Sequence, residues 1–420
     1  MLEVSQRACL WIACLAITLL GACRSEPAKP DPNAIASRYI QLAWELSRHD
    51  PSLVDHWIVE PLAPAGAGRR PVAMLRVAAD ALTAETAAAL PEVDGLERLR
   101  LEWLQGQARA LQLAARRLLG ESVPFDVEAR LAFGVSPQRA DRFQVDRAHE
   151  LLERELPGKG TLADRLAAFR ARFRVAVEAR ETVLRAALAA CGEAAAPGLS
   201  LPPDNAIEVA FVDGLPWDAH ARYLGGHRTR IEVDGSQPLD LTRALRVACH
   251  EGPVGHHAQH IWADDELVGR RGWREYGLVP GFGPALLLAE GAAEIGSELA
   301  MPAARRAQVY RETLAPAAGL SKLETDDFAR LIRIEDAQAA IEPLIADIAR
   351  EYLDNRITAA TAAERLEQEV LMPAPEAFVF FMERRRTRIL AYTEGLRLAR
   401  ERLGAAGLPG LRSLFVPKPR

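Results

Sequence analysis

The chain has 420 residues, of which 49% are hydrophobic and 26% are charged, and its formal net charge is −5. This length can bury at least one large core, and the composition is ordinary for a soluble globular protein. The net negative charge, and the lack of aromatic residues among the few basic clusters, argue against nucleic acid as a partner. Alanine, leucine, arginine and glutamate are abundant, so most of the chain is expected to be helical.

The first thirty residues have the pattern of an export signal. Arg7 precedes an apolar run over residues 8–20, which has the length of the hydrophobic region of a secretory signal and is short for a bilayer span. The residues Leu-Gly-Ala-Cys at 20–23 resemble the cleavage box of bacterial lipoproteins, in which the cysteine is acylated. We therefore expect a signal peptide over 1–22 and a lipid on Cys23; an uncleaved anchor or a chance cysteine is the alternative.

A short tether over residues 23–33 is expected to join the lipid to the folded part. The residue after the cysteine is Arg24 and not an aspartate. This sequence resembles that of lipoproteins that are passed on to the outer membrane. The expected location is therefore the bacterial outer membrane, facing the periplasm. Cys191 and Cys249 remain in the mature chain, and their number implies no disulfide framework.

Helical patterns follow in chain order. Apolar residues on one face of 39–46 predict a first helix that ends near 49–51, and the Pro/Gly-rich stretch 61–71 predicts a loop. Apolar residues at helical spacing predict a long helix over 96–118. The pair Thr161 and Asp164 has the pattern of a capping box, so another helix is expected to begin there.

The pattern changes near residue 200 and then returns to helix. The stretches 241–251 and from Pro284 onward predict helices, and no strong linker divides residues 34–420. The predicted fold is therefore mainly α: one large helical domain with a small antiparallel β-sheet beside the site described next. Three short strands, separated by Gly, Pro and Asp turns, are predicted at 208–212, 221–225 and 228–234.

The stretch CHEGPVGHHAQH, residues 249–260, holds four of the nine histidines. A zinc-hydrolase helix usually reads H-E-x-x-H, in which two imidazoles one turn apart bind the ion and the glutamate serves as general base. His250 and Glu251 begin that pattern, but Val254 stands where the second histidine is expected. Four histidines beside an H-E pair favour a metal site over a chance cluster.

The second ligand depends on the shape of this helix. On a straight helix, residue 257 returns to the face of His250, which favours His257. The segment 252–255 argues against a straight helix, because its proline removes a backbone donor and its two glycines loosen the backbone. A break there would bring His256 round to His250 instead, so both histidines stay open at this point.

Two acidic residues could complete the site. Glu290 and Glu294 lie four apart and share one face of the next predicted helix, so one could bind the ion while the other orients a ligand histidine. Taken alone, they would be an ordinary solvated helix face. His260 could also orient a ligand or be a surface residue. His220 and His227 are expected to be structural, although a strand beside the metal could present one of them to the substrate.

These residues resemble a known family. It is the bacterial metallopeptidase-like family called domain of unknown function 885, whose usual motif is H-E-G-x-P-G-H-H. The likeness spans nearly the whole mature chain, and only the histidine motif is highly specific. It is carried by His250–Gly252, Gly255–His257, Gln259 and Glu290–Glu294, with further similarity at 125–129, 156–158 and 386–395.

The resemblance implies a mostly helical, gluzincin-like fold with one divalent ion, Zn²⁺, held by two histidines and a glutamate. This chain departs from the family at one point, because Val254 takes the place of the motif's proline and Pro253 comes one residue earlier. The choice between His256 and His257 therefore stays open. Carried over residue by residue, the metal ligands and the general base become His250, His256, Glu290 and Glu251.

The expected function is metal-dependent hydrolysis of a peptide or a related amide bond. Glu251 would take a proton from the attacking water and pass it to the leaving amine. Tyr392 is the expected catalytic donor to the developing oxyanion, and Arg386 the expected partner of a substrate carboxylate. Glu294 and His257 are expected to orient the ligands. The structural alternatives are a core role for Tyr392 and a surface charge for Arg386.

A lipid-anchored metal- or peptide-binding protein without catalytic activity is the alternative function. A metal-assisted hydrolase of cell-wall or amide metabolites is a third hypothesis. Glu251 separates the first two, because hydrolysis needs it and binding does not. The expected partners are a peptide or small amide substrate and, through the N-terminal lipid, the membrane.

Overall fold

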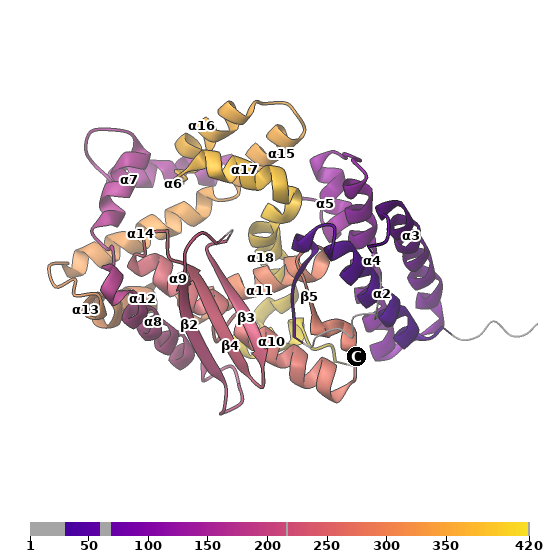
Figure 1. Ribbon diagram of the computed structural model, residues 1–420. Helices are drawn as coiled ribbons and strands as arrows, with labels where there is room; N and C mark the ends of the chain where they lie inside the picture. The colour runs from indigo at the N-terminus through magenta and orange to yellow at the C-terminus, as the bar shows by residue number, and fades with distance from the viewer. Residues whose placement is uncertain (1–29, 59–68, 216, 419–420) are drawn as a thin grey trace, which may run out of the picture.

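The computed structural model describes residues 30–58, 69–215 and 217–418, and helices dominate it (Figure 1). The expected signal peptide and Cys23, together with most of the predicted loop at 61–71, lie outside the described residues. The prediction of a mainly α fold is confirmed. Within the described ranges, no helix is both long and apolar enough to cross a bilayer.

The helices at the N-terminal end pack against one another on one side of the molecule (Figure 1). Leu101, Leu104, Ala108 and Leu111 are all buried, and this spacing places them on the inner face of the long helix that the sequence predicts. The helices of this group are α2 (Pro32–Ser47), α3 (Val72–Ala89), α4 (Gly95–Leu118) and α5 (Phe125–Phe133).

A second group of helices lies on the other side of the molecule and across its top in Figure 1. The predicted capping box is present, because Asp164 N donates to Thr161 Oγ1 while Thr161 N donates to Asp164 Oδ2. The helices of this group are α6 (Arg142–Glu155), α7 (Leu162–Ala171), α12 (Ala303–Val309), α13 (Ala315–Ala317), α14 (Thr325–Ile341), α15 (Leu344–Leu353), α16 (Ala359–Glu369) and α17 (Pro375–Arg385).

The three predicted strands are present as β2 (Ala206–Val212), β3 (Ala219–Gly225) and β4 (Arg228–Asp234). They form a sheet in the order β2-β4-β3, which is mixed and not antiparallel as expected. β4 pairs antiparallel with β3 through a tight turn, and it lies between β3 and β2. Because the chain reverses twice between β2 and β4, these two strands run parallel.

A second sheet has two strands, β1 (Val54–Trp57) and β5 (Leu278–Pro280), which pair antiparallel. The sequence analysis did not predict these strands. They are short and lie next to helices, so no alternating pattern marks them. Their importance is positional, because β1 carries Asp55 and His56 into the centre of the molecule.

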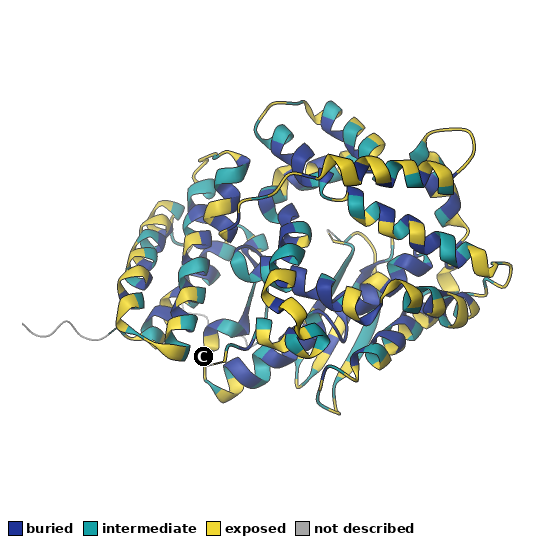
Figure 2. Cartoon of the chain, turned by 180° about the vertical axis from the view of Figure 1, so that it is seen from behind, coloured by how far each residue is buried: buried dark blue, intermediate teal, exposed yellow. Residues whose placement is uncertain are grey.

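Helices from both halves of the chain form the centre of the protein, and their inward faces are buried (Figure 2). The contact between α11 and α18 is close: a Cβ atom placed on Gly291 would lie 1.9 Å from the carbonyl carbon of Gly395. Only glycine allows the two backbones to approach so closely. The central helices are α8 (Arg180–Ala195), α9 (Leu241–Glu251), α10 (His256–Trp262), α11 (Pro284–Ala300) and α18 (Leu390–Leu403).

Short helical turns connect these elements. Two of them are π-helical, η4 (Ala263–Arg270) and η6 (Tyr310–Leu314). A four-residue α-turn, α19 (Gly407–Gly410), lies near the C-terminus. The others are 3₁₀ turns: η1 (Pro51–Leu53), η2 (Leu90–Glu92), η3 (Val177–Ala179), η5 (Arg274–Gly277), η7 (Arg386–Ile389), η8 (Gly404–Ala406) and η9 (Leu411–Leu414).

A disulfide bond joins Cys191 on α8 to Cys249 on α9, with their Cα atoms 5.5 Å apart. The sequence analysis did not foresee this bond, because 58 residues separate the two cysteines and nothing in the letters shows that they meet. The bond fixes the end of α9 to α8 immediately before His250. It therefore holds in place the helix turn that begins the histidine motif.

Candidate metal centre

The predicted interruption between His250 and His256 is present. α9 ends at Glu251, a four-residue turn follows, and α10 begins at His256. A Cβ atom on Gly255 would lie 1.7 Å from the carbonyl oxygen of His250, so this sharp turn needs glycine at residue 255. The glycines of the motif thus allow the chain to fold back on the end of α9.

The break brings His250 and His256 together with Glu290 from α11. The Nε2 atom of His250 lies 3.1 Å from Oε2 of Glu290, and Nε2 of His256 lies 3.5 Å from the same oxygen. One donor atom from each residue lies within 4.8 Å of the other two, and the two rings are nearly perpendicular at 81°. These three residues can therefore face one ion, and His256 is the second histidine of the set.

Glu294 contacts the other side of the His250 ring. Its Oε1 lies 3.0 Å from Nδ1 of His250, so each ring nitrogen of His250 faces a carboxylate. A carboxylate behind a ligand histidine fixes the orientation of the ring and increases its basicity. The position of Glu294, one turn after Glu290 on α11, is the one that the sequence spacing indicates.

The electrostatics of the group favour charged acids. Burial would raise the pKa of Glu290, but hydrogen bonds and charges from His250 and His256 hold that pKa far below its usual range. Burial would lower the pKa of His250, but Glu294 and Glu290 raise it well above 6.5. The pKa of His256 is also raised, because its bond to Glu290 outweighs burial. In the metal-free protein, protons thus occupy the place between these rings and Glu290.

Gln259 orients the second histidine. Its side-chain NH₂ group donates to the carbonyl oxygen of Ala289 at 2.9 Å, so its Oε1 is free to accept a bond from Nδ1 of His256 at 3.0 Å. A ring that is held through Nδ1 directs Nε2 to Glu290 and the centre, where it can bind an ion once its proton is lost. Gln259 belongs to the motif, but its role depends on Ala289 from α11 and is not visible in the letters.

His257 does not belong to the centre, which corrects the expectation that it orients a ligand. It is fully buried, with Nδ1 2.8 Å from Thr229 Oγ1 and Nε2 3.1 Å from Asn205 Oδ1. Burial lowers its pKa to about 4. Adjacent residues on a helix point about 100° apart, so the turn that directs His256 to the centre directs His257 to the sheet.

Glu251 and Tyr392 lie beside the three ligands. Glu251 is buried at the last position of α9, and no described residue donates a hydrogen bond to its carboxylate. The ring of Tyr392 lies 6.2 Å from that of His250, and the side chain is 39% exposed. The charge of Glu290, with burial, raises the pKa of Tyr392, so its hydroxyl stays protonated and can donate.

Arg386 lies away from the centre, in a buried ion pair. Its Nε donates to Oε2 of Glu128 at 2.5 Å, and its Nη2 donates to the carbonyl oxygen of Val123. Two nitrogens of the guanidinium are thus engaged inside the protein. This arrangement gives Arg386 a structural role, since it joins η7 to α5, and argues against the expected contact with a substrate carboxylate.

Arg246 is an arginine that lies near the centre. It stands one turn before His250 on α9, its side chain is 52% exposed, and it pairs with Asp218. Burial would lower its pKa, but the charges of Asp218 and Glu294 outweigh burial and raise it. The signal in the sequence was its spacing of four from His250, which places both side chains on one helix face.

The chain was also compared with known proteins. No family model matches it, and no curated protein matches it. Among solved structures, it is similar to a candidate lipoprotein from Colwellia psychrerythraea, with a TM-score of 0.50 and 16% identity over 83% of this chain and 67% of that one. A candidate lipoprotein of unknown function from Shewanella oneidensis gives a TM-score of 0.47 and 12% identity, over 99% and 93% of the two chains. The first likeness shows a common fold.

Proposed function

We propose that this protein is a metal-dependent hydrolase of peptide or related amide bonds, anchored by lipid in the bacterial cell envelope. The observation that carries the proposal is the convergence of His250, His256 and Glu290, with Glu251 unbonded beside them. Two imidazoles and one carboxylate are the ligand set of hydrolytic zinc sites, which keep one position open.

The residues present fit such an ion in a second respect. The remote nitrogen of each ligand ring faces a polar side chain: Nδ1 of His250 is in ion-pair contact with Glu294, and Nδ1 of His256 is hydrogen-bonded to Gln259. Ligand histidines in metalloproteins are held in this way. When bound, an ion of the zinc class lowers the pKa of a water molecule and polarises a carbonyl.

Glu251 is the proposed general base. Its carboxylate accepts the proton of the attacking water and passes it to the nitrogen of the leaving amine. Its freedom from other hydrogen bonds keeps it available for that proton. The Tyr392 hydroxyl donates a hydrogen bond to the oxygen that becomes negative as the carbonyl is attacked, because its raised pKa keeps it in the donating form.

Arg246 replaces Arg386 as the proposed contact for a negatively charged part of the substrate. Its half-exposed guanidinium lies on the same helix as His250 and Glu251, and a planar fork suits a carboxylate. Asp218 holds it from one side and would compete with the substrate for it. We therefore expect Arg246 to affect substrate binding more than the chemical step.

The envelope location rests on the N-terminal letters, with Cys23 as the proposed site of the lipid. The solved structure from Colwellia that shares the fold is itself described as a candidate lipoprotein, which supports this part of the proposal. A tether of about ten residues would place the catalytic domain close to the membrane surface. The outer membrane, facing the periplasm, is the proposed location.

The test is elemental analysis of the purified mature protein together with cleavage of a peptide library. Glu251→Gln should keep the metal content of the wild type and lose turnover, whereas Glu290→Gln should lose the ion as well. Glu298→Gln is a matched control, because Glu298 lies on the same helix but pairs with Arg400 at the surface. If the wild-type protein holds the ion at this centre and cleaves no peptide or amide, the hydrolase proposal is wrong and the binding-protein alternative takes its place.

A further inference from the structure

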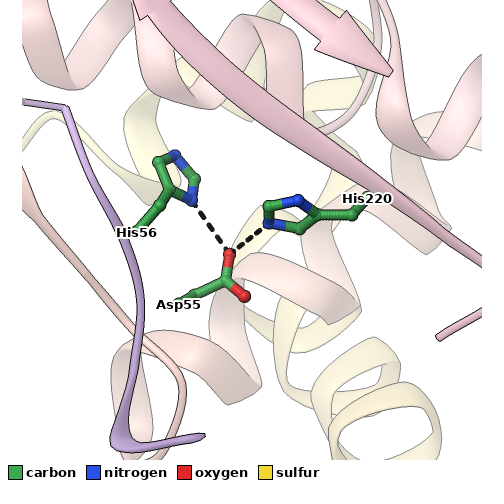
Figure 3. A group of neighbouring side chains, drawn as sticks. All are labelled: Asp55, His56 and His220. Atoms are coloured by element: carbon green, nitrogen blue, oxygen red, sulfur yellow. Dashed lines mark hydrogen bonds and ion pairs between the residues drawn. The ribbon is translucent and has the colours of Figure 1, made fainter. Parts of the chain in front are cut away.

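A second group of metal-type donors lies beside the first, and the proposed function does not use it. Asp55 and His56 come from β1, and His220 comes from β3 (Figure 3). We call these three residues the Asp55 cluster. The Oδ2 atom of Asp55 lies 3.0 Å from Nδ1 of His56 and 2.7 Å from Nε2 of His220. One donor atom from each residue lies within 4.8 Å of the other two.

The geometry is that of ligands facing one point. Figure 3 shows both rings directing a nitrogen to the same carboxylate oxygen. Zinc bonds of about 2.0–2.1 Å at a tetrahedral angle separate neighbouring ligand atoms by roughly 3.3 Å. The first centre has separations of 3.1 and 3.5 Å between its histidines and Glu290, so the Asp55 cluster repeats the arrangement of that centre with donors of the same kind.

The cluster is built into the fold and is still open to solvent. The side chains of His56, His220 and Asp55 are 10%, 17% and 24% exposed, so small ligands can reach the group while most of each ring is held by protein. The residues come from two segments about 165 positions apart in the chain, and each segment is a strand of a different sheet. Water can therefore complete the coordination of an ion that the three residues hold.

The Asp55 cluster and the first centre are neighbours. The ring of His260 lies between them, 4.7 Å from the ring of His56 and 6.1 Å from the ring of His256, with which it is stacked. The Nδ1 atom of His260 is buried and has no hydrogen-bond partner among the described residues. The Asp55 cluster and the first centre thus lie on either side of His260.

We propose that Asp55, His56 and His220 form a second metal site, which takes a divalent transition-metal ion of the zinc class. Two imidazole nitrogens and one carboxylate oxygen suit zinc, cobalt or iron(II), whereas calcium and magnesium prefer oxygen donors throughout. This site goes beyond the proposed hydrolysis and does not depend on it. The competing explanation is that Asp55 only forms hydrogen bonds, one to its neighbour His56 and one that joins β1 to His220 on β3.

The test counts ions per chain in the whole mature protein after removal of metal and titration with Co²⁺ or Zn²⁺. Asp55→Asn and His220→Ala remove donors of the second site, and Glu290→Gln removes a donor of the first. His227→Ala is the matched control on the same sheet. Its ring bonds Asp204 through one nitrogen and Asp265 through the other, so these groups face no common point.

The expected result is two ions in the wild type and in His227→Ala, and one ion in each of the other variants. The double variant Glu290→Gln with His220→Ala should bind none. If the proposed hydrolase centre holds no ion, the wild type should bind one ion that Asp55→Asn removes and Glu290→Gln keeps. The two proposals can therefore fail separately.

One outcome overturns the second site. If the wild type binds a single ion that Glu290→Gln removes, and Asp55→Asn and His220→Ala leave it in place, the cluster is only a hydrogen-bonded link between strands. Circular dichroism of each variant controls for folding. The visible spectrum of bound Co²⁺ gives a second reading, because loss of one nitrogen-rich site changes the intensity of the bands while the other site remains.

Discussion

The Nδ1 atom of His250 lies 3.0 Å from Oε1 of Glu294, on the side of the ring opposite to Glu290. This carboxylate fixes the ring so that Nε2 faces the centre. We expect Glu294→Gln to weaken binding of Zn²⁺ by about 10–100-fold, the usual effect of removing a partner of a ligand histidine. Calorimetric titration of the metal-free protein measures this.

Glu298→Gln serves again as the control for Glu294, since it removes a charge one turn further along α11 without touching a histidine. It should leave the affinity unchanged. Equal affinities of Glu294→Gln and the wild type would show that the ring is held by packing alone.

The affinity for metal should still increase with pH at values above 6.5, the ordinary pKa of histidine. The pKa values of His250 and His256 are raised above 6.5 by Glu294 and Glu290, so protons compete with the ion for both rings beyond that pH. Affinity should therefore keep rising with pH above 6.5. Titrations in buffers of different ionisation enthalpy count the protons that are released.

The stability of the metal-free protein should fall as pH rises, whereas its affinity for metal rises. A raised pKa in the folded state means that the charged pairs contribute their full stability below pH 6.5 and lose it as pH rises through the folded-state values. The Tm of the metal-free protein should fall over this range, and bound Zn²⁺ should suppress the fall. An unchanged Tm would contradict the assigned pairs.

Substitution of Arg386 should affect stability, whereas substitution of Arg246 should affect substrate binding. Arg386→Gln leaves the buried Glu128 without its main partner, so it should lower the free energy of unfolding by about 3–5 kcal/mol. Arg246→Gln should raise KM for substrates with a carboxylate and change kcat little, because the guanidinium lies on the surface beside the centre. Denaturant unfolding and steady-state kinetics on both variants check this, and a raised KM in Arg386→Gln with normal stability would reverse the assignment.

The disulfide between Cys191 and Cys249 should stabilise the protein. A bond that closes a loop of 58 residues removes unfolded-state entropy worth about 4 kcal/mol in the chain-entropy account. Phosphine reductant should therefore lower the Tm of the metal-free wild type. The double variant with alanine at both positions should melt at the lower temperature and no longer respond to reductant; a reductant-dependent Tm in that variant would contradict the explanation.

The sequence predicts those parts of the fold that depend on local pattern. Buried Leu104, Ala108 and Leu111 recur at helical spacing, and Thr161 caps its helix, because both features are properties of a few adjacent residues. The break before His256 was predictable for the same reason, since glycine and proline act on their own backbone.

The parts that sequence reasoning missed depend on contacts between distant segments. Asp55 and His56 have no neighbouring motif, and they meet His220 only through the tertiary fold, 165 positions along the chain. The bond between Arg386 and Glu128 joins residues 258 positions apart, so the letters showed an arginine-rich run and not its buried partner. The parallel pairing of β2 with β4 is likewise a matter of topology and leaves no local trace.

The backbone contact between Gly291 and Gly395 fixes two proposed functional residues relative to each other. Glu290 is next to Gly291 on α11, and Tyr392 lies one turn before Gly395 on α18. The proposed ligand and the proposed oxyanion donor therefore belong to two helices that are in close backbone contact. Any side chain at either glycine would force these helices apart. The packing of α11 against α18 therefore fixes the spacing between Glu290 and Tyr392.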